Sequence, residues 1–237
     1  MRDGRLRRTE RRVVIEGPHL VAAALAAGIK PVALIATEAA LAKPEVATLV
    51  RQSRIAPVLV SPSVFGVIAD AEMPPGIAAE IALPELKRDG AAVFLEGVQD
   101  AGNVGAIIRS AAAFGVARLI ADRQCADAWS PKVLRAGMGG HFAIAIQPVD
   151  DLGAAIAAFS GRTICTVVKG GRPLREIQLS GRVGWIFGAE GAGLSEAIVS
   201  KASERVTIAM AGGDSLNVAA AAAICLYEAF SRLGGGS

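Results

Sequence analysis

Aromatic residues are scarce in this sequence of 237 residues, at 4% of the total. A protein so poor in rings cannot hold nucleobases mainly by stacking them on aromatic side chains. The cysteines Cys125, Cys165 and Cys225 are isolated and form no C-x-x-C pair, which indicates a reducing compartment and gives no signal of a metal site. No apolar run of about 18 residues is free of polar or turn residues, and the charged N-terminus has no signal-type segment, so we predict no membrane span.

Charged residues are few and unevenly placed. The sequence is 52% hydrophobic and 20% charged, which suffices for a sizeable core, and its net charge is +3. Residues 1–12 hold six arginines against Asp3 and Glu10, a balance of +4, so the rest of the chain carries −1. A basic arm over residues 1–11 is typical of proteins that neutralise phosphates, which favours a polyanion as partner. A solvated tail is the alternative.

Strand and helix patterns alternate from residue 12 to residue 83, which predicts a small α/β domain. We expect strands at residues 13–15, 32–36, 58–60 and 76–83, and helices that begin at Pro18, near Leu41 and after Ser61. The domain contains no catalytic cluster, and we assign its single His19 to structure or surface. Residues 84–90 are polar and rich in chain breakers and predict a linker, so residues 91–237 form a second domain.

A lone cation stands out in the second domain. Asn103 is expected to cap a helix that contains Arg109, which is the strong charge among alanine and aliphatic residues. Such a charge needs a partner or water. Arg109 is therefore a candidate functional residue, and an ion pair with Glu96 or Glu190 is the structural alternative.

Further strands and helices follow, and one strand ends in a glycine turn. The expected strands are residues 91–95, 118–121, 142–146, 163–168 and 183–187, with short helices at 130–136 and 152–159. The last strand breaks into Gly188-Ala189-Glu190-Gly191-Ala192-Gly193-Leu194-Ser195, which predicts a ligand crevice at its carboxyl end. Its glycine spacing is G-x-x-G-x-G, so a nicotinamide-dependent enzyme is disfavoured. In the flexible segment 135–141, His141 is either structural or faces a substrate.

A final strand, turn and helix complete the pattern. Residues 205–210 predict a strand, a glycine pair follows, and residues 218–232 predict a helix so rich in alanine and aliphatic residues that most of its sides are buried. Asp214 or Ser215 is expected to cap this helix. Ser215 and Asn217 then lie at the helix mouth, where unpaired N–H groups face outward.

Three of these stretches together resemble the three motifs of the SpoU/TrmH family of RNA ribose 2′-O-methyltransferases, in the same order and spacing. The first motif, N-x-G-x-I-x-R-[ST]-A-x-x-F-G, is matched by Asn103, Gly105, Ile107, Arg109, Ser110, Ala111, Phe114 and Gly115. The second, F-G-x-E-x-x-G-L-S, is matched by Phe187, Gly188, Glu190, Gly193, Leu194 and Ser195. The third, I-P-M-x-G-x-x-x-S-L-N-V, is matched by Ile208, Met210, Gly212, Ser215, Leu216, Asn217 and Val218.

The sequence departs from these motifs at three loop positions. Asp100-Ala101 stands where the family often has Asp-Pro, and Ala209 replaces the usual proline of the third motif. The turn before Ser215 is one residue short of the commonest version. None of these positions carries a reacting side chain, so the class is unaffected.

The resemblance implies a C-terminal α/β domain with a trefoil knot (SPOUT), preceded by a small substrate-binding α/β domain that resembles a ribosomal protein. It implies S-adenosylmethionine as cofactor, no metal, a cytoplasmic location and an RNA partner, ribosomal rather than transfer RNA. It also implies a homodimer, built on helices 103–114 and 218–226, in which each site is completed by the neighbouring subunit. A knotted methyltransferase that acts on a base and an inactive RNA-binding relative are the alternatives.

The resemblance further implies roles for individual residues. The implied catalytic residues are Arg109, Asn103, Glu190, Ser215 and Asn217. The implied cofactor-binding residues are Gly188, Ile208, Met210 and Leu216, together with Ser215 and Asn217. The RNA-binding candidates are Arg5, Arg7, Arg8, Arg11, Arg12, Arg135 and His141. Because a guanidinium stays protonated, we expect Arg109 to hold a phosphate and stabilise developing negative charge rather than accept a proton.

Overall fold

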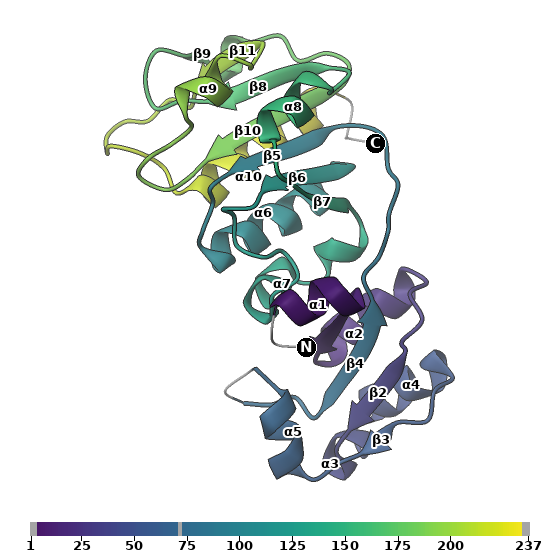
Figure 1. Cartoon of the computed structure of the whole chain (residues 1–237). Helices are drawn as coiled ribbons and strands as arrows, with labels where there is room; N and C mark the ends of the chain where they lie inside the picture. Colours follow the sequence, from purple (N-terminus) through teal and green to yellow (C-terminus); the bar gives the residue numbers. More distant parts are fainter. Residues whose placement is uncertain (1–3, 71–72, 234–237) are drawn as a thin grey trace.

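The computed structural model describes residues 4–70 and 73–233, which form two lobes (Figure 1). The N-terminal lobe contains α1 (Gly4–Glu10), β1 (Arg12–Glu16), α2 (Pro18–Ala26), β2 (Ala33–Ala36), α3 (Glu38–Leu41), α4 (Pro44–Ser53), β3 (Val58–Leu59), α5 (Pro62–Ile68) and β4 (Ile77–Ala82). Its strands form one mixed sheet in the order β1-β4-β2-β3. Strand β4 pairs antiparallel with both β1 and β2, whereas β2 and β3 are parallel.

Local signals set the ends of these elements. Pro18 occupies the first turn of α2, where its missing N–H is not needed. The Ser61 hydroxyl accepts a hydrogen bond from the Val64 N–H at 3.3 Å and so starts α5. The single helix expected near residue 41 is divided into α3 and α4, because Pro44 disfavours helical backbone at the residue before it.

The C-terminal lobe is built on a parallel sheet. Its elements are β5 (Ala92–Glu96), α6 (Ala101–Ala113), β6 (Arg118–Asp122), α7 (Pro131–Gly137), η1 (Gly140–Phe142), β7 (Ala145–Val149), α8 (Leu152–Ala157), β8 (Arg162–Thr166), β9 (Arg172–Pro173), η2 (Leu174–Glu176), β10 (Val183–Gly188), α9 (Glu196–Val199), β11 (Glu204–Thr207) and α10 (Val218–Arg232). The strand order is β7-β6-β5-β10-β8-β11-β9, and every pairing is parallel.

Helices cover both faces of this sheet. Val93 and Leu95 of β5 pack in one core with α6 and α10, while Phe94 packs in a second core with α8 and α9. Successive side chains of a strand point to opposite faces, so this apolar run is buried on both. The sheet therefore offers ligands its edges and strand ends, not its faces.

The two lobes share a core at α7 and η1. Leu134 and Phe142 from the C-terminal lobe pack in the hydrophobic cluster that contains Val13 and Leu20 of the N-terminal lobe. This packing explains why the strand expected at 142–146 begins later, at β7, since Phe142 is needed in the shared core.

Residues 4–10 form a docked helix rather than an extended arm. Helix α1 lies where the lobes meet (Figure 1). The Arg7 side chain is 4% exposed, and its Nη2 lies 2.6 Å from Asp127 Oδ2. Arg2 lies outside the described residues.

Candidate active site

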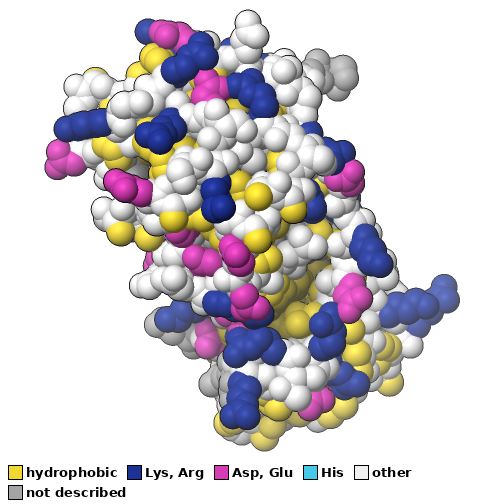
Figure 2. Space-filling model, turned by 45° about the horizontal axis from the view of Figure 1, so that its top comes forward, with side chains coloured by type: hydrophobic (Ala, Val, Ile, Leu, Met, Phe, Trp, Pro, Cys, Tyr) yellow, Lys and Arg dark blue, Asp and Glu magenta, His cyan; other side chains and the backbone are white. Residues whose placement is uncertain are grey.

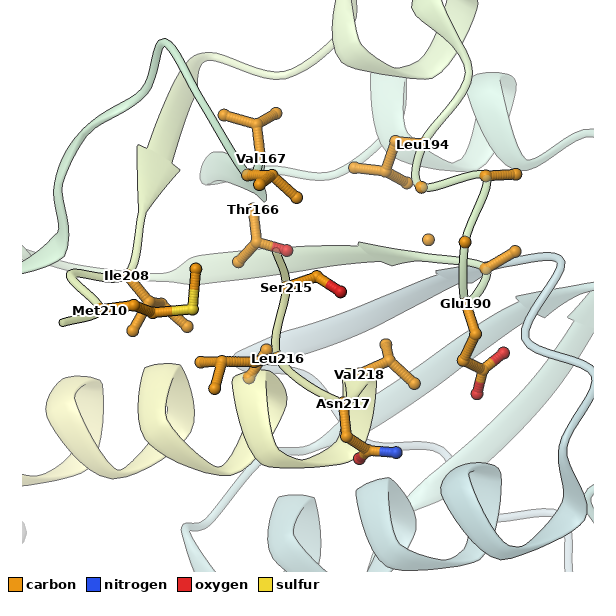
Figure 3. A pocket seen from close by; sticks show the side chains of 17 residues that line it. Thr166, Val167, Glu190, Leu194, Ile208, Met210, Ser215, Leu216, Asn217 and Val218 are labelled. Atoms are coloured by element: carbon orange, nitrogen blue, oxygen red, sulfur yellow. The ribbon is translucent and has the colours of Figure 1, made fainter. Parts of the chain in front are cut away.

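A pocket of about 330 Å³ opens at the carboxyl ends of β8, β10 and β11 (Figure 3). Its walls are the loop that begins at Thr166, the loop Gly188–Leu194 and the segment from Ile208 to Val218. Ligands of parallel α/β sheets bind outside the carboxyl ends of the strands. The crevice predicted at Gly188 is thus present. The loop after β8 forms a further wall of the pocket. In the sequence, the only sign of this wall is that a predicted strand ends there.

The loop after β10 folds back tightly on itself. A Cβ on Gly188 would lie 2.4 Å from the carbonyl carbon of Gly193 and 2.5 Å from the nitrogen of Leu194, closer than real Cβ atoms approach. Gly193 N–H donates to the Ala189 carbonyl at 2.9 Å, in an isolated antiparallel bridge. Only glycine fits at position 188, so the second motif's first glycine is a packing requirement of the pocket wall.

Asn217 caps α10 and leaves Ser215 at the pocket. Asn217 Oδ1 accepts hydrogen bonds from Ala219 N at 2.9 Å and Ala220 N at 3.2 Å. The prediction of Asp214 or Ser215 as the cap is wrong, because the residue directly before the helix reaches both N–H groups. The Ser215 hydroxyl points into the pocket (Figure 3) and has no hydrogen bond within the described part of the chain.

Asn103, Glu190 and Asn217 form a hydrogen-bonded string that joins the three motifs. Asn217 Nδ2 donates to Asn103 Oδ1 at 2.9 Å, and Asn103 Nδ2 donates to the Glu190 carboxylate. The predicted capping role of Asn103 is wrong, since Asp100 Oδ1 accepts from Asn103 N at 2.8 Å and caps α6. The Asn103 amide side chain is thereby free to link α6 with the loop after β10 and the start of α10.

Arg109 lies on the exposed side of α6 and does not line the pocket. Within residues 4–70 and 73–233 its guanidinium has no hydrogen bond or ion pair. The expected pair with Glu96 or Glu190 is not formed, because both carboxylates bind other side chains. A Cβ on Gly140 would lie 3.2 Å from Arg109 Cα, so Arg109 borders η1. Its charge is available to an anionic group from outside the chain.

The predicted RNA-binding arginines divide into exposed and buried ones. The exposed ones on α1 and around the start of β1 are Arg5, Arg8, Arg11 and Arg12. Arg135 is half-buried and its Nη1 lies 2.8 Å from Asp70 Oδ2. The prediction for Arg7 is wrong, because its buried guanidinium binds Asp127. On the face drawn in Figure 2, Lys and Arg side chains are interspersed with Asp and Glu and form no single basic surface.

His141 is a core residue, so its prediction as an RNA contact is wrong. The ring is 0% exposed, and its Nε2 lies 2.8 Å from the Ala128 carbonyl oxygen. Burial lowers the pKa of His141 from 6.5 to about 4, so the ring is neutral at pH 7 and Nε2–H is the donor. A Cβ on Gly137 would lie 2.4 Å from this ring, which shows how closely the helix end approaches it.

Metal and thiol chemistry find no support in the described residues. Among residues 4–70 and 73–233 no group of three His, Cys, Asp or Glu side chains could hold a metal ion. Burial, followed by the nearby Asp122 carboxylate, raises the pKa of the Cys125 thiol to about 12.

Among residues 4–70 and 73–233, no helix is both long enough and apolar enough to span a bilayer.

The fold and the pocket define a parallel α/β domain with a small-molecule site at the carboxyl ends of its strands. Residues 90–227 match the model of the SpoU rRNA Methylase family, and residues 1–79 match the MRM3-like substrate binding domain. The chain therefore belongs to the SpoU rRNA methylase family, and the predicted resemblance is confirmed.

Named relatives and solved structures agree with this family. The chain is 34% identical over 225 residues to the 23S rRNA (guanosine(2553)-2′-O)-methyltransferase RlmP of Bacillus subtilis, covering 91% of this chain and 87% of that protein. The SpoU methyltransferase AviRb of Streptomyces viridochromogenes, solved with AdoMet, superposes with a TM-score of 0.87 at 25% identity over 97% of this chain and 93% of AviRb. An AdoMet-bound rRNA methyltransferase of Sinorhizobium meliloti gives 0.83 at 28% identity, over 98% and 92%.

Proposed function

We propose that this protein transfers a methyl group from S-adenosylmethionine to the 2′-hydroxyl of a ribose in ribosomal RNA, in the cytoplasm. The observation that carries the proposal is the string in which Asn103 of the first motif hydrogen-bonds Glu190 and Asn217, two pocket-lining residues of the second and third motifs. The named relatives that act on 23S rRNA favour ribosomal over transfer RNA as the substrate.

The pocket residues fit the cofactor. Its volume of about 330 Å³ falls within the range of small-molecule sites, and Ile208, Met210 and Leu216 give it apolar walls suited to an adenine ring. The hydroxyls of Thr166 and Ser215 face the space, and neither has a hydrogen bond among the described residues (Figure 3). These two hydroxyls and the backbone of the loop after β10 would hold the polar parts of the cofactor.

The protein's task in this reaction is positioning. When bound, the cofactor would supply a methyl group activated by a sulfonium; the ribose oxygen would take that carbon, the C–S electron pair would stay on sulfur, and the hydroxyl proton would pass to water. Well-oriented approach contributes roughly 7–11 kcal/mol to such a step. Asn103 and Asn217 hold each other and Glu190 in place, so a hydroxyl that enters the pocket meets a preset carboxylate and amide.

The proposal also includes a role for Arg109 and a second subunit. The pocket of one chain lacks Arg109, while α10 exposes Ile224 at 41% and Tyr227 at 57%. We expect a two-fold homodimer through α6 and α10, in which Arg109 serves RNA bound partly by the partner. An always-charged guanidinium there would hold a phosphate and stabilise negative charge on the ribose oxygen.

A trefoil knot is part of the proposal. After β11 at one side of the sheet the chain returns to α10, which packs against β10 and α6. The connecting residues, such as Ser215, lie between Thr166 at the end of β8 and Glu190 in the loop after β10 (Figure 3). This arrangement supports threading of the C-terminal segment through the loops that wall the pocket.

The test is transfer of labelled methyl groups from S-adenosylmethionine to 23S rRNA isolated from cells that lack the gene, with nucleoside analysis by mass spectrometry. We expect a 2′-O-methylated nucleoside. A base-methylated nucleoside would instead support the knotted base methyltransferase. RNA binding without any methyl transfer would support the inactive relative.

A further inference from the structure

Glu96, the last residue of β5, contacts both ends of the loop that walls the pocket. In the β5–β10 ladder Glu96 is the register partner of Gly188, where the loop begins. Its carboxylate accepts two hydrogen bonds from Ser195, where the loop ends: one from the backbone N–H at 2.8 Å and one from the hydroxyl at 2.6 Å. One residue therefore closes the loop at both ends.

Ser195 also links Glu96 to the start of the next helix, α9. Its Oγ donates to Glu96 and accepts from Ile198 N at 3.3 Å, which caps α9. A hydroxyl has one proton and two lone pairs, so both bonds are satisfied together. The Glu96 carboxylate thus orients the cap as well as the loop end.

The strand end that carries Glu96 is itself held firmly. Gly97 N–H lies 3.2 and 3.0 Å from the two carboxylate oxygens of Asp122, at the end of the neighbouring β6. The same carboxylate accepts from Gln124 N and Cys125 N, each at 3.0 Å. Glu96 therefore reaches toward the loop from a fixed base.

The loop has little support of its own. Residues 190–193 are exposed, and their glycines give the backbone additional freedom. Besides Glu96, the loop is held by its internal Ala189–Gly193 bridge, the bond between Glu190 and Asn103, and the half-buried side chain of Leu194. Loss of the Glu96 contact would release the Ser195 end.

We infer that Glu96 is a positioning residue: through Ser195 it holds the loop 188–195 in the shape that walls the pocket and presents Glu190 to Asn103. The inference rests on the proposed function, because it takes the pocket as the S-adenosylmethionine site. It needs no contact between Glu96 and substrate. It predicts that loss of the contact weakens cofactor binding and slows transfer while RNA affinity stays unchanged.

The test compares Glu96→Gln, Ser195→Ala, the double variant and Ser195→Thr, with Asp150→Asn as control, since Asp150 is an exposed carboxylate that binds Arg123 elsewhere. Calorimetry should show at least a tenfold weaker Kd for S-adenosylmethionine in Glu96→Gln and in Ser195→Ala. The double variant should show less than the sum of the two single losses, because either change removes the bond from the Ser195 hydroxyl, whereas Ser195→Ala keeps the bond from the backbone N–H of residue 195 to Glu96. Ser195→Thr, which keeps the hydroxyl, should bind within about twofold of the wild type, as should Asp150→Asn.

Hydrogen exchange on the cofactor-free protein provides a readout that does not depend on the proposed reaction. In Glu96→Gln the amides of Gly193 and Ser195, which donate hydrogen bonds in this loop, should exchange at least tenfold faster, with the rest of the chain unchanged. Wild-type exchange in this loop, or faster exchange throughout the chain, would overturn the positioning role. If the wild type fails to bind S-adenosylmethionine, the proposed function fails, while the exchange result still decides whether Glu96 holds the loop.

Discussion

Two glycine-rich segments of the C-terminal lobe, Gly188–Ser195 and Gly137–His141, have similar compositions but opposite surroundings. The first follows a central strand and forms an exposed pocket wall. The second joins α7 to η1 inside the contact between the lobes, where a Cβ on Gly139 would lie 2.7 Å from Ala23 of α2. Glycine serves chain reversal in one segment and close packing between elements in the other.

The comparison teaches which polar residues become functional. Glu190 lies in a loop at the carboxyl end of a parallel strand, where loops from distant segments converge, and it meets Asn103 there. His141 follows a helix whose glycines let neighbours approach, and it is enclosed by them. The position of a polar residue relative to a strand end therefore says more about its role than its type does.

Arg109 can break this comparison, because it lies next to Gly140 of the second segment and is nevertheless expected to take part in methyl transfer. We expect Arg109→Ala to lower methyl transfer by about 10²–10³-fold, the usual loss when one group that stabilises developing negative charge is removed. The affinity for S-adenosylmethionine should change little, since Arg109 does not line the pocket. Transfer assays and calorimetric titration measure the two effects. Arg123→Ala, which removes an arginine paired with Asp150, is the matched control. Near-normal transfer by Arg109→Ala would remove Arg109 from the catalytic residues.

The asparagine string offers a second, smaller effect that separates activity from stability. We expect Asn103→Ala and Asn217→Ala each to reduce transfer at least about tenfold, because both break the bond between the two asparagines, and the loss should be larger for Asn103→Ala, which also breaks the bond to Glu190. Only Asn217→Ala should also lower the free energy of unfolding, by about 1 kcal/mol, because Asn217 caps α10. Urea unfolding and transfer assays on both variants check this. Equal losses of stability would show that the cap and the string cannot be separated.

Much of the fold could be predicted because its signals are local. The run 183–187 and the glycine after it predict a buried strand and a crevice, and β10 and the pocket are both found there. The capping residues could not be ranked so easily. Asp100 and Asn103 are both good caps, and the choice depends on where the chain leaves β5.

The sequence-based errors at the site have one physical cause, which is contact between segments far apart in the chain. Arg7 is buried because Asp127 lies 120 residues away in sequence but beside it in the fold. The role of Glu96 depends on Ser195 in the same way. The sequence signal for Glu96 is its place at the end of a buried strand, in the segment that leads to the first motif at Asn103.

The buried His141 of the second glycine segment should make the stability of the protein depend on pH. Burial lowers the pKa of His141 to about 4 from 6.5, so between these values the unfolded chain binds a proton that the folded chain does not. Stability is then complete above pH 6.5 and falls as the pH drops toward 4, by at most about 1.4 kcal/mol per pH unit for one proton. Urea unfolding at pH 7, 6 and 5 should show this slope in the wild type and a smaller one in His141→Gln. Identical slopes would mean that other groups cause the loss.

The smallest expected effect distinguishes two neighbouring arginines of α1. Arg8 is exposed, whereas Arg7 is buried against Asp127. If α1 contacts RNA, Arg8→Gln should make the slope of log K against log salt shallower by about 0.7–0.9, because one phosphate contact releases about that number of counterions. Arg7→Gln should leave the slope unchanged, since a buried side chain makes no phosphate contact, but should lower the melting temperature by breaking its ion pair. Filter binding to 23S rRNA fragments over a range of salt concentrations gives the slopes. Equal slopes for the wild type and Arg8→Gln would exclude a phosphate contact by Arg8.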